Sequence, residues 1–366
     1  MDSVTQFALG AAVGTAVLGR KMGVRRAAFT GGLIGTLPDL DVYLPADDPV
    51  ESFVGHRGWS HSIFVHAAVA PLIGEVLVRG FVVLREARIG VWIAVFLCLA
   101  THALLDALTV YGTRLFWPLW PEPLGVGSIF IIDPLYMIPL LIVVIWAFFL
   151  RDWTQLFGKT LLGCHIISTA YLGWTLIGQR IAEAKSIDYL AARGIVPDDL
   201  LAGPTPLNSL FWRVIAVDGA EYYHVYVPIG GDAFAVTGYH HLRWQHDLSC
   251  WAERAVAGSG HVGRLARFSD GFYQITSRGK DVLVSDLRMG LYPEYVFQFV
   301  VAERKGKEIM DTPPQRIRGK RSQAGDWEWL GAGVLGKRMI RPAEAERLLT
   351  KPLLDTKATG QSITAC

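Results

Sequence analysis

The chain has 366 residues, of which 51% are hydrophobic and 19% are charged, and its mean hydropathy is +0.32. This composition is too apolar for an ordinary soluble protein of this length. The formal net charge of only +2 argues against nucleic acid as a partner. Apolar residues concentrate before about residue 178, which predicts a membrane domain followed by a soluble one.

Two short apolar runs open the chain, at residues 4–19 and 27–37, with a basic stretch between them. Both are short for membrane-spanning helices. Their glycine and alanine residues predict a tight helical hairpin in which the two backbones approach closely. A polar segment follows at residues 38–61.

Four longer apolar runs then predict helices, at residues 62–78, 89–110, 129–150 and 160–178. With the hairpin, this makes about five to six helices. The loop at 111–128, rich in Pro, Gly and Trp, is typical of a membrane interface. Basic stretches at 20–26, 79–88 and 151–159 predict cytoplasmic loops, so the polar segment and the chain after about residue 180 are expected on the opposite side.

From about residue 181 the pattern changes to short β-rich pieces such as "YYHVYVPI" and "YVFQFVVAER", separated by Gly and Asp turns. The predicted fold class is an α-helical multi-pass membrane domain, residues 1–180, followed by a β-rich (α+β) soluble domain, residues 181–366. In the second domain, "YHH" at 239–241 gives only a weak metal signal, and solvent-exposed histidines are the simpler interpretation.

Ionisable side chains lie within and next to the apolar runs. His102 and Asp106 are four residues apart on a predicted helix and therefore share one face. Charged groups at membrane depth are costly, so they are functional candidates by default. Asp133 precedes Pro134 at the start of another predicted helix, where an N-cap explains it better than a ligand does.

The polar segment adds two carboxylates and two imidazoles. Asp39 and Asp41 follow Pro38, and in an extended segment side chains at i and i+2 point the same way. His56 and His61 lie just before the run at 62–78. All of them are expected near the same non-cytoplasmic membrane surface as His102 and Asp106.

Imidazole and carboxylate together are the ligands expected for zinc, or for manganese or iron. Each residue taken alone is more simply a cap, a turn residue or a hydrogen-bonded interface residue. The combination favours a metal site, with candidate ligands Asp39, Asp41, His56, His61, His102 and Asp106. Six candidates exceed one tetrahedral zinc, which leaves open two metals, or one metal with outer partners.

Three further polar residues lie in or next to the polar segment. Arg57 is suited to hold an anionic group of a substrate, or to anchor the chain at the membrane interface. His66 is five residues from His61, which on a helix lies well off the same face. Ser60 shows no nucleophile context.

At this point the motifs resemble a known family. "MDSVTQFALGAAVG" at the start, "GTLPDLDVYLP" at 35–45, "HRGWSHS" at 56–62, "HALLDALTVYGT" at 102–113 and "FIIDPLY" at 130–136 stand in the family's order and cover roughly the first 180 residues. They resemble the YdjM/YbcI-like (DUF457) bacterial inner-membrane proteins, known as predicted membrane-bound metal-dependent hydrolases. "PTPLNSLFWRV" at 204–214 resembles the start of the extra C-terminal domain of a long subgroup.

The resemblance implies metal ligands at the same six residues. The His102–Asp106 element is also similar to part of the metal site of zinc-dependent phospholipases C, a distant fold-level analogy. Two positions depart from the family pattern. Thr5–Gln6 stands where many members have a Thr–His pair, and Thr15 lies near a position where close relatives are expected to be acidic.

Together these observations predict a bacterial inner-membrane, metal-dependent hydrolase with its site at the outer membrane surface and a periplasmic soluble domain. The metal is expected to be zinc, with manganese or iron as alternatives. Asp39 or Asp41 would act as general base, and Arg57 would hold an anionic group of the substrate. A phosphoester of a lipid or lipid-linked molecule fits a site at headgroup depth. The alternatives are a non-catalytic metal-binding, transport or assembly protein, and a purely structural membrane protein.

Overall fold

The computed structural model describes residues 1–349 apart from residues 232, 307 and 321. Its contacts divide the chain into two compact units. The helical unit comprises residues 1–44, 55–176 and 206–208, and the β-rich unit comprises residues 45–54, 177–205 and those from 209 on. A helical N-terminal region followed by a β-rich C-terminal region confirms that part of the predicted fold class. The domain boundary near residue 180 stays a prediction.

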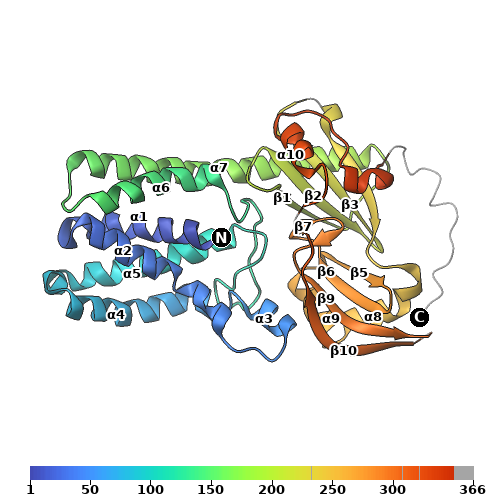
Figure 1. The fold of residues 1–366 in the computed structure, drawn as a ribbon, viewed down its shortest axis with the longest axis horizontal. Coiled ribbons are helices and arrows are strands. Elements are labelled where there is room, and N and C mark those ends of the chain that lie inside the picture. Colours follow the sequence, from blue (N-terminus) through green and yellow to red (C-terminus); the bar gives the residue numbers. More distant parts are fainter. Residues whose placement is uncertain (232, 307, 321, 350–366) are drawn as a thin grey trace. The chain divides into compact units, whose positions relative to one another are not determined.

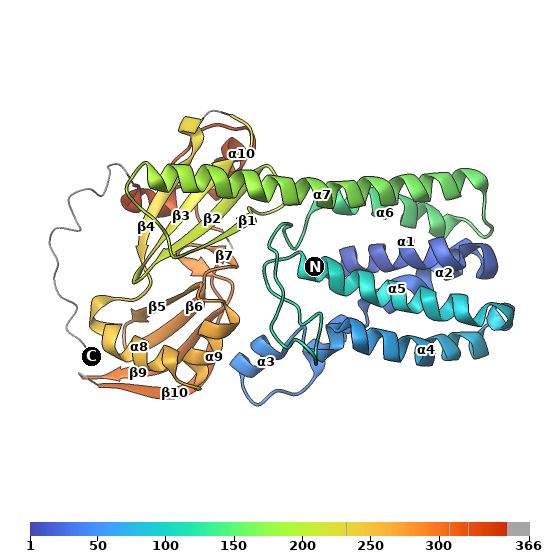
Figure 2. The ribbon, with the colours of Figure 1, turned by 180° about the vertical axis from the view of Figure 1, so that it is seen from behind.

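The helical unit is built from helices that pack side by side (Figures 1 and 2). Its elements are α1 (Ser3–Met22), α2 (Val24–Thr36), the 3₁₀ helices η1 (Pro38–Tyr43), η2 (Trp59–His61) and η3 (Val82–Ala87), then α4 (Ile63–Gly80), α5 (Arg88–Ala107), α6 (Pro134–Phe149) and α7 (Gln155–Ala191). The helix α3 (Pro49–Gly55) lies almost entirely in the β-rich unit.

Among the described residues, three helical segments are long and apolar enough to cross a membrane: Ile63–Gly80, Val82–Ala107 and Gln155–Ala191. The helix α6 is a shorter apolar helix. It begins at Pro134 rather than near residue 129 because Asp133 caps it, accepting hydrogen bonds from the backbone N–H of Leu135 at 3.0 Å and of Tyr136 at 3.3 Å. The predicted N-cap is therefore confirmed. Helix α7 continues to Ala191, past the expected end near residue 178, and contributes to both units.

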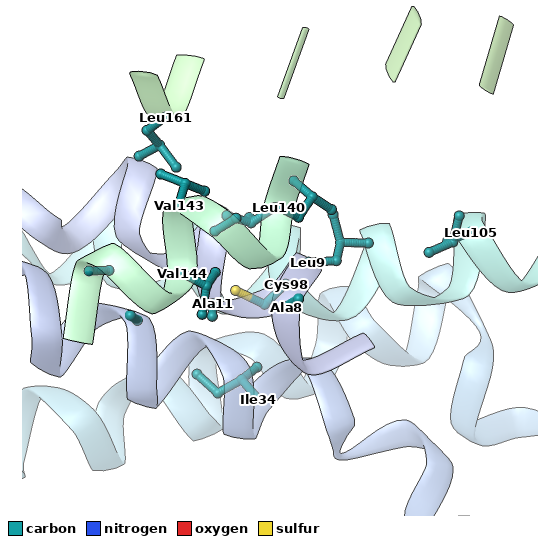
Figure 3. Close-up of a cluster of buried hydrophobic side chains, with 14 of the residues drawn as sticks. Ala8, Leu9, Ala11, Ile34, Cys98, Leu105, Leu140, Val143, Val144 and Leu161 are labelled. Atoms are coloured by element: carbon teal, nitrogen blue, oxygen red, sulfur yellow. The ribbon is translucent and has the colours of Figure 1, made fainter. Parts of the chain in front are cut away.

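The core of the helical unit is formed by apolar side chains from α1, α2, α5, α6 and α7 (Figure 3). The labelled members are Ala8, Leu9, Ala11, Ile34, Cys98, Leu105, Leu140, Val143, Val144 and Leu161, all of them buried. The α1 members are mostly small, which lets the neighbouring helices come close to its backbone.

The helices α1 and α2 form the predicted hairpin and meet through glycines. A Cβ atom added to Gly31 would lie 2.4 Å from the Gly10 carbonyl oxygen, and one added to Gly10 would lie 2.5 Å from the Gly31 carbonyl oxygen. Gly35, one turn further along α2, would clash with the Gly10 Cα at 2.8 Å. Because the obstacles are backbone atoms, no side-chain rotation relieves these clashes. The prediction of a close-packed hairpin is confirmed.

We expect Gly31→Ala to push α2 away from α1 and to lower the free energy of unfolding by about 1–3 kcal/mol, the usual cost of overpacking. The measurement is denaturant unfolding of the detergent-purified protein. Gly163→Ala on α7 is the control, because a Cβ atom there has nothing within 4 Å, so the gain in helix propensity makes it neutral or stabilising. Equal unfolding of Gly31→Ala and wild type would contradict the packing argument.

The β-rich unit contains two antiparallel four-stranded sheets. The first has the order β1 (Asp199–Pro204), β2 (Phe211–Asp218), β3 (Glu221–Pro228), β4 (Thr237–Leu242). The second has the order β10 (Glu308–Ile317), β9 (Gln298–Lys305), β6 (Asp281–Asp286), β5 (Tyr273–Arg278), and β7 (Gly290–Leu291) pairs with β8 (Glu294–Tyr295). The other elements are η4 (Ala233–Ala235), η5 (His246–Leu248), α8 (Ser249–Ala257), α9 (His261–Phe268), α10 (Asp326–Val334) and η6 (Pro342–Arg347).

Residues 45–54 pack within the β-rich unit although they come from the predicted polar segment of the membrane domain. The Arg264 guanidinium contacts the Asp48 carboxylate at 3.1 Å and the Glu51 carboxylate at 2.5 Å. The Phe53 ring lies 4.9 Å, centroid to centroid, from the Phe268 ring. Residues 45–54, within the segment between Asp41 and His56, thus belong to the β-rich unit by their contacts.

A buried polar network on β3 and β4 was missed by the sequence analysis. Both oxygens of Glu344, on η6, accept hydrogen bonds: Oε1 from His224 Nδ1 at 2.7 Å and His241 Nε2 at 2.9 Å, and Oε2 from the Tyr226 hydroxyl and the Arg341 guanidinium, each at 2.8 Å. His224, His241 and Glu344 are fully buried, so the interpretation of His241 as solvent-exposed was wrong.

The Glu344 carboxylate is fully hydrogen-bonded, whereas His224 Nε2 and His241 Nδ1 are buried without a hydrogen-bond partner among the described residues. These three side chains could also hold a metal ion. Burial lowers the pKa of His224 to about 3 and also lowers that of His241. Both rings are therefore neutral N–H donors. Burial alone would raise the pKa of Glu344, but its two histidine partners hold it well below the usual range. The network thus fastens η6 to the first sheet.

We expect Glu344→Ala to lower the local stability of β3 and β4 by about 1–3 kcal/mol, because it leaves two buried imidazoles without their acceptor. Arg341 keeps its ion pair with Asp326 in this variant. Hydrogen exchange of the strand amides, followed by mass spectrometry, measures this. Glu346→Ala is the matched control, since Glu346 is exposed two residues away. Equal protection in both variants would show that the network does not stabilise the sheet.

Candidate metal centre

Four of the six predicted ligands come together in the helical unit. Asp39 lies on η1, His61 on η2, and His102 and Asp106 one turn apart on α5. Each side chain offers one ligand atom, all within 4.8 Å of one another, so the group could hold a metal ion. His61, His102 and Asp106 are buried, with side-chain exposures of 0–1%, while the Asp39 side chain is 20% exposed. The group therefore has one open side, at Asp39.

The spacing of the ligand atoms is that of a metal shell. The Nε2 atoms of His61 and His102 are 3.1 Å apart, and Asp39 Oδ1 lies 3.5 Å from each. Asp106 Oδ2 lies 3.4 Å from His61 Nε2 and 3.3 Å from His102 Nε2. Ligands about 2.0–2.1 Å from a tetrahedral zinc ion are about 3.3 Å from one another. These distances therefore match a tetrahedral site.

The position of the proton on His102 also fits a bound cation. The Gly35 carbonyl, which can only accept, lies 2.6 Å from His102 Nδ1. A neutral His102 therefore carries its proton on Nδ1 and directs a lone pair from Nε2 into the cluster. Asp106 Oδ2 is buried and has no hydrogen-bond partner among the described residues. The lone pairs of His102 Nε2 and Asp106 Oδ2 are thus directed at one point, where a divalent metal could accept them. The residues present therefore fit such an ion.

The other oxygen of Asp106 contacts Met1 and a side chain of α1. Asp106 Oδ1 accepts a hydrogen bond from Gln6 Nε2 at 3.0 Å and contacts the Met1 nitrogen. Gln6 was not predicted as a site residue. The only sequence signal was that Gln6 replaces the histidine expected there from the family resemblance.

Arg57 is tied into the same group. Its Nε lies 3.2 Å from Asp106 Oδ2, and its guanidinium donates a hydrogen bond to Thr109 Oγ1 at 3.0 Å. The side chain is buried, the guanidinium lies over the Tyr111 ring, and the backbone is left-handed with φ +58°. That backbone is costly for a non-glycine residue and requires support from its surroundings. Arg57 therefore offsets carboxylate charge inside the protein.

Asp41 and His56, the other two predicted ligands, form a neighbouring pair. The Asp41 carboxylate accepts hydrogen bonds from His56 Nδ1 at 2.7 Å, the Arg57 backbone N–H at 3.0 Å and the Ser60 hydroxyl at 2.6 Å. The expectation of an extended segment was wrong, because residues 38–43 form the 3₁₀ helix η1. With three residues per turn, the side chains of Asp39 and Asp41 point in different directions.

Both aspartates on η1 are held ionised. Burial alone would raise the pKa of Asp39, but its contacts with His102 and His61 hold it below the usual range. For Asp41, the hydrogen bond with His56 likewise outweighs burial and lowers the pKa. Ionised carboxylates are the form that binds a metal.

His66 lies outside the cluster, as its spacing predicted, but it contacts the adjoining loop. Its Nε2 lies 2.8 Å from the Ser60 carbonyl oxygen.

Comparison with known proteins confirms the predicted family resemblance. Residues 1–182 match the family model described as YdjM inner membrane protein. The inner membrane protein YbcI of Escherichia coli (strain K12) is 28% identical over 162 residues, which cover 44% of this chain and 86% of YbcI. The uncharacterized protein YfhP of Bacillus subtilis (strain 168) is 26% identical over 233 residues, 61% of this chain and 67% of YfhP. No solved structure matches. These findings support a YdjM/YbcI-like family for the N-terminal half of the chain.

The geometry predicts that His102→Ala and His56→Ala differ in their effect on metal. His102→Ala removes a ligand atom, so we expect zinc to be lost from the purified protein. His56→Ala removes only a partner of Asp41, and we expect zinc to stay bound with affinity lowered by about 10–100-fold at most. Elemental analysis and competition with a chelator measure both, and circular dichroism checks folding. Equal zinc loss in the two variants would instead assign His56 as a ligand.

Proposed function

We propose that this chain, whose first 182 residues match the YdjM family, is a metal-dependent hydrolase of the bacterial inner membrane. The observation that carries the proposal is the convergence of four ligand atoms, five of whose six separations are 3.1–3.5 Å, with the Asp39 side chain partly exposed. The family and YbcI are both described as inner membrane proteins, and the three apolar helical segments support that location for this chain.

We assign metal binding to the buried residues of the cluster and proton transfer to the partly exposed one. His61, His102 and Asp106 are buried and would hold the ion. A bound zinc, manganese or iron ion would supply a Lewis acid and lower the pKa of a bound water. Asp39 lies on the open side, where its carboxylate is placed to accept a proton. Asp41, already hydrogen-bonded to three donors, is less suited to that role and would orient His56 and the backbone of Arg57.

Arg57 has two roles in this proposal. Its contact with Asp106 offsets the negative charge of the buried carboxylate. The cluster and its neighbouring pair contain three aspartates and this one arginine, a balance that a divalent cation improves. Binding of an anionic group of the substrate by the same guanidinium stays the prediction made from the sequence.

The surroundings of the site favour a lipid or lipid-linked substrate. Large apolar side chains next to the site residues in sequence are exposed, among them Leu40 at 53%, Tyr43 at 82% and Trp59 at 53%. Exposed apolar and aromatic groups around a polar site are typical of a membrane interface. We therefore propose a phosphoester at headgroup depth as the scissile group, on the outer face of the membrane, with the β-rich domain in the periplasm.

The second candidate is a membrane protein that binds metal without hydrolysis, for transport or assembly. It is favoured by one observation, the presence of four protein ligand atoms that all lie within 4.8 Å of one another. Structural zinc sites are closed by four protein ligands, whereas catalytic sites keep one position for water.

A turnover assay separates the two functions. Zinc-loaded protein in detergent is given a chromogenic phosphodiester and, separately, mixed micelles of anionic phospholipid. The hydrolase reading predicts turnover that Asp39→Asn lowers by about 10²–10⁴-fold, the usual contribution of a general base. Asp47→Asn, at an exposed position in the β-rich unit, serves as the control. Stoichiometric zinc without turnover of any of these phosphoesters would favour the non-catalytic function.

A further inference from the structure

We propose that Ser60 is a positioning residue, whose hydroxyl fixes His61 in the tautomer that directs the Nε2 lone pair toward the metal. The inference rests on the proposed metal site and adds a residue that neither the motifs nor the comparisons assign. Ser60 lies between the metal cluster and the Asp41–His56 pair, on η2 next to His61.

Two hydrogen bonds determine where the protons are. Ser60 Oγ lies 2.6 Å from Asp41 Oδ2 and 2.9 Å from His61 Nδ1. An ionised carboxylate can only accept, so the hydroxyl proton of Ser60 is donated to Asp41. The Ser60 oxygen is then free to accept, and the proton shared with His61 is the ring's own, on Nδ1. A neutral His61 with its proton on Nδ1 has its lone pair on Nε2.

The tautomer of His61 matters because its alternative form, protonated on Nε2, also has a hydrogen-bond acceptor nearby. With the proton on Nε2, His61 would donate to His102 Nε2, only 3.1 Å away. The Gly35 carbonyl already makes His102 Nε2 an acceptor. That internal hydrogen bond would occupy the position of the metal. The Asp41–Ser60 pair opposes it by offering an acceptor to Nδ1 instead.

The position of Ser60 is itself held. The Ser60 carbonyl oxygen lies 2.8 Å from Nε2 of the buried His66. A carbonyl only accepts, so His66 donates and fastens the backbone of η2 to α4. The His61 side chain is fully buried, so water does not compete for its nitrogens. The geometry therefore gives Ser60 an orienting role, because its hydroxyl group lies between the Asp41 carboxylate and His61 Nδ1.

The test compares Ser60→Ala, which removes the hydroxyl, with Ser60→Thr, which keeps it. Zinc affinity is measured on the detergent-purified full chain by competition with a chelator. We expect Ser60→Ala to bind zinc about 10–100-fold more weakly, as is usual for loss of a group that orients a ligand, and Ser60→Thr to restore most of the affinity. Thr101→Ala is the control, because that hydroxyl lies beside His102 but bonds only within α5, to the Leu97 and Cys98 carbonyls.

A second readout needs no metal. In zinc-free protein with ¹⁵N-labelled histidine, nuclear magnetic resonance distinguishes a protonated Nδ1 from a protonated Nε2. We expect His61 to be protonated on Nδ1 in wild type and Ser60→Thr, and to shift toward the Nε2-protonated form in Ser60→Ala.

The outcomes separate the two proposals. Wild-type affinity in Ser60→Ala, or an unchanged His61 tautomer, overturns the role of Ser60 while leaving the metal site intact. Wild type that binds no zinc overturns the metal site, and the tautomer measurement then still decides whether Ser60 directs His61.

Discussion

In the helical unit, two imidazoles and two carboxylates converge on one point, where they could hold a metal ion. Five of the six separations between these two imidazole nitrogens and two carboxylate oxygens are 3.1–3.5 Å. The Asp106 oxygen among them is buried, and the Arg57 Nε atom lies 3.2 Å from it. In a low-dielectric interior, unpaired acceptors at such distances repel one another and are costly. A divalent metal at this point would stabilise the arrangement. Gly35, Gln6 and Arg57, which contact His102 and Asp106, would then orient the ligands and balance their charge.

The packing of the helices is what brings these atoms together. Close contact between α1 and α2, allowed by Gly10 and Gly31, brings α1 and α2 together as a unit that also packs on α5. One result is that the Gly35 carbonyl, near the end of α2, reaches His102 on α5. Asp39 follows directly on η1, because Pro38 starts a 3₁₀ helix there. Small residues at the start of the chain therefore serve the site although none of them is a ligand.

Sequence reasoning succeeded where a local pattern decides the structure and failed where distant contacts do. Spacing of i and i+4 put His102 and Asp106 on one face, and small residues gave the hairpin. The direction of Asp41 was missed because a 3₁₀ helix and an extended segment differ little in local sequence. The roles given to Ser60 and Gln6 depend on partners 19 and 100 residues away. No single-sequence pattern predicts such contacts, and the same holds for the Glu344 network in the β-rich unit.

The central claim is that His61, His102 and Asp106 hold a metal ion, with Asp39 beside it at the partly exposed side of the same cluster. X-ray absorption at the zinc edge of the purified, zinc-loaded wild-type protein tests it most directly. The account predicts two imidazole nitrogens and two oxygens at about 2.0–2.1 Å. A spectrum without imidazole scattering, or one with a six-coordinate shell of oxygen atoms alone, would contradict this claim. The histidines and aspartates of the cluster would then have only a structural role.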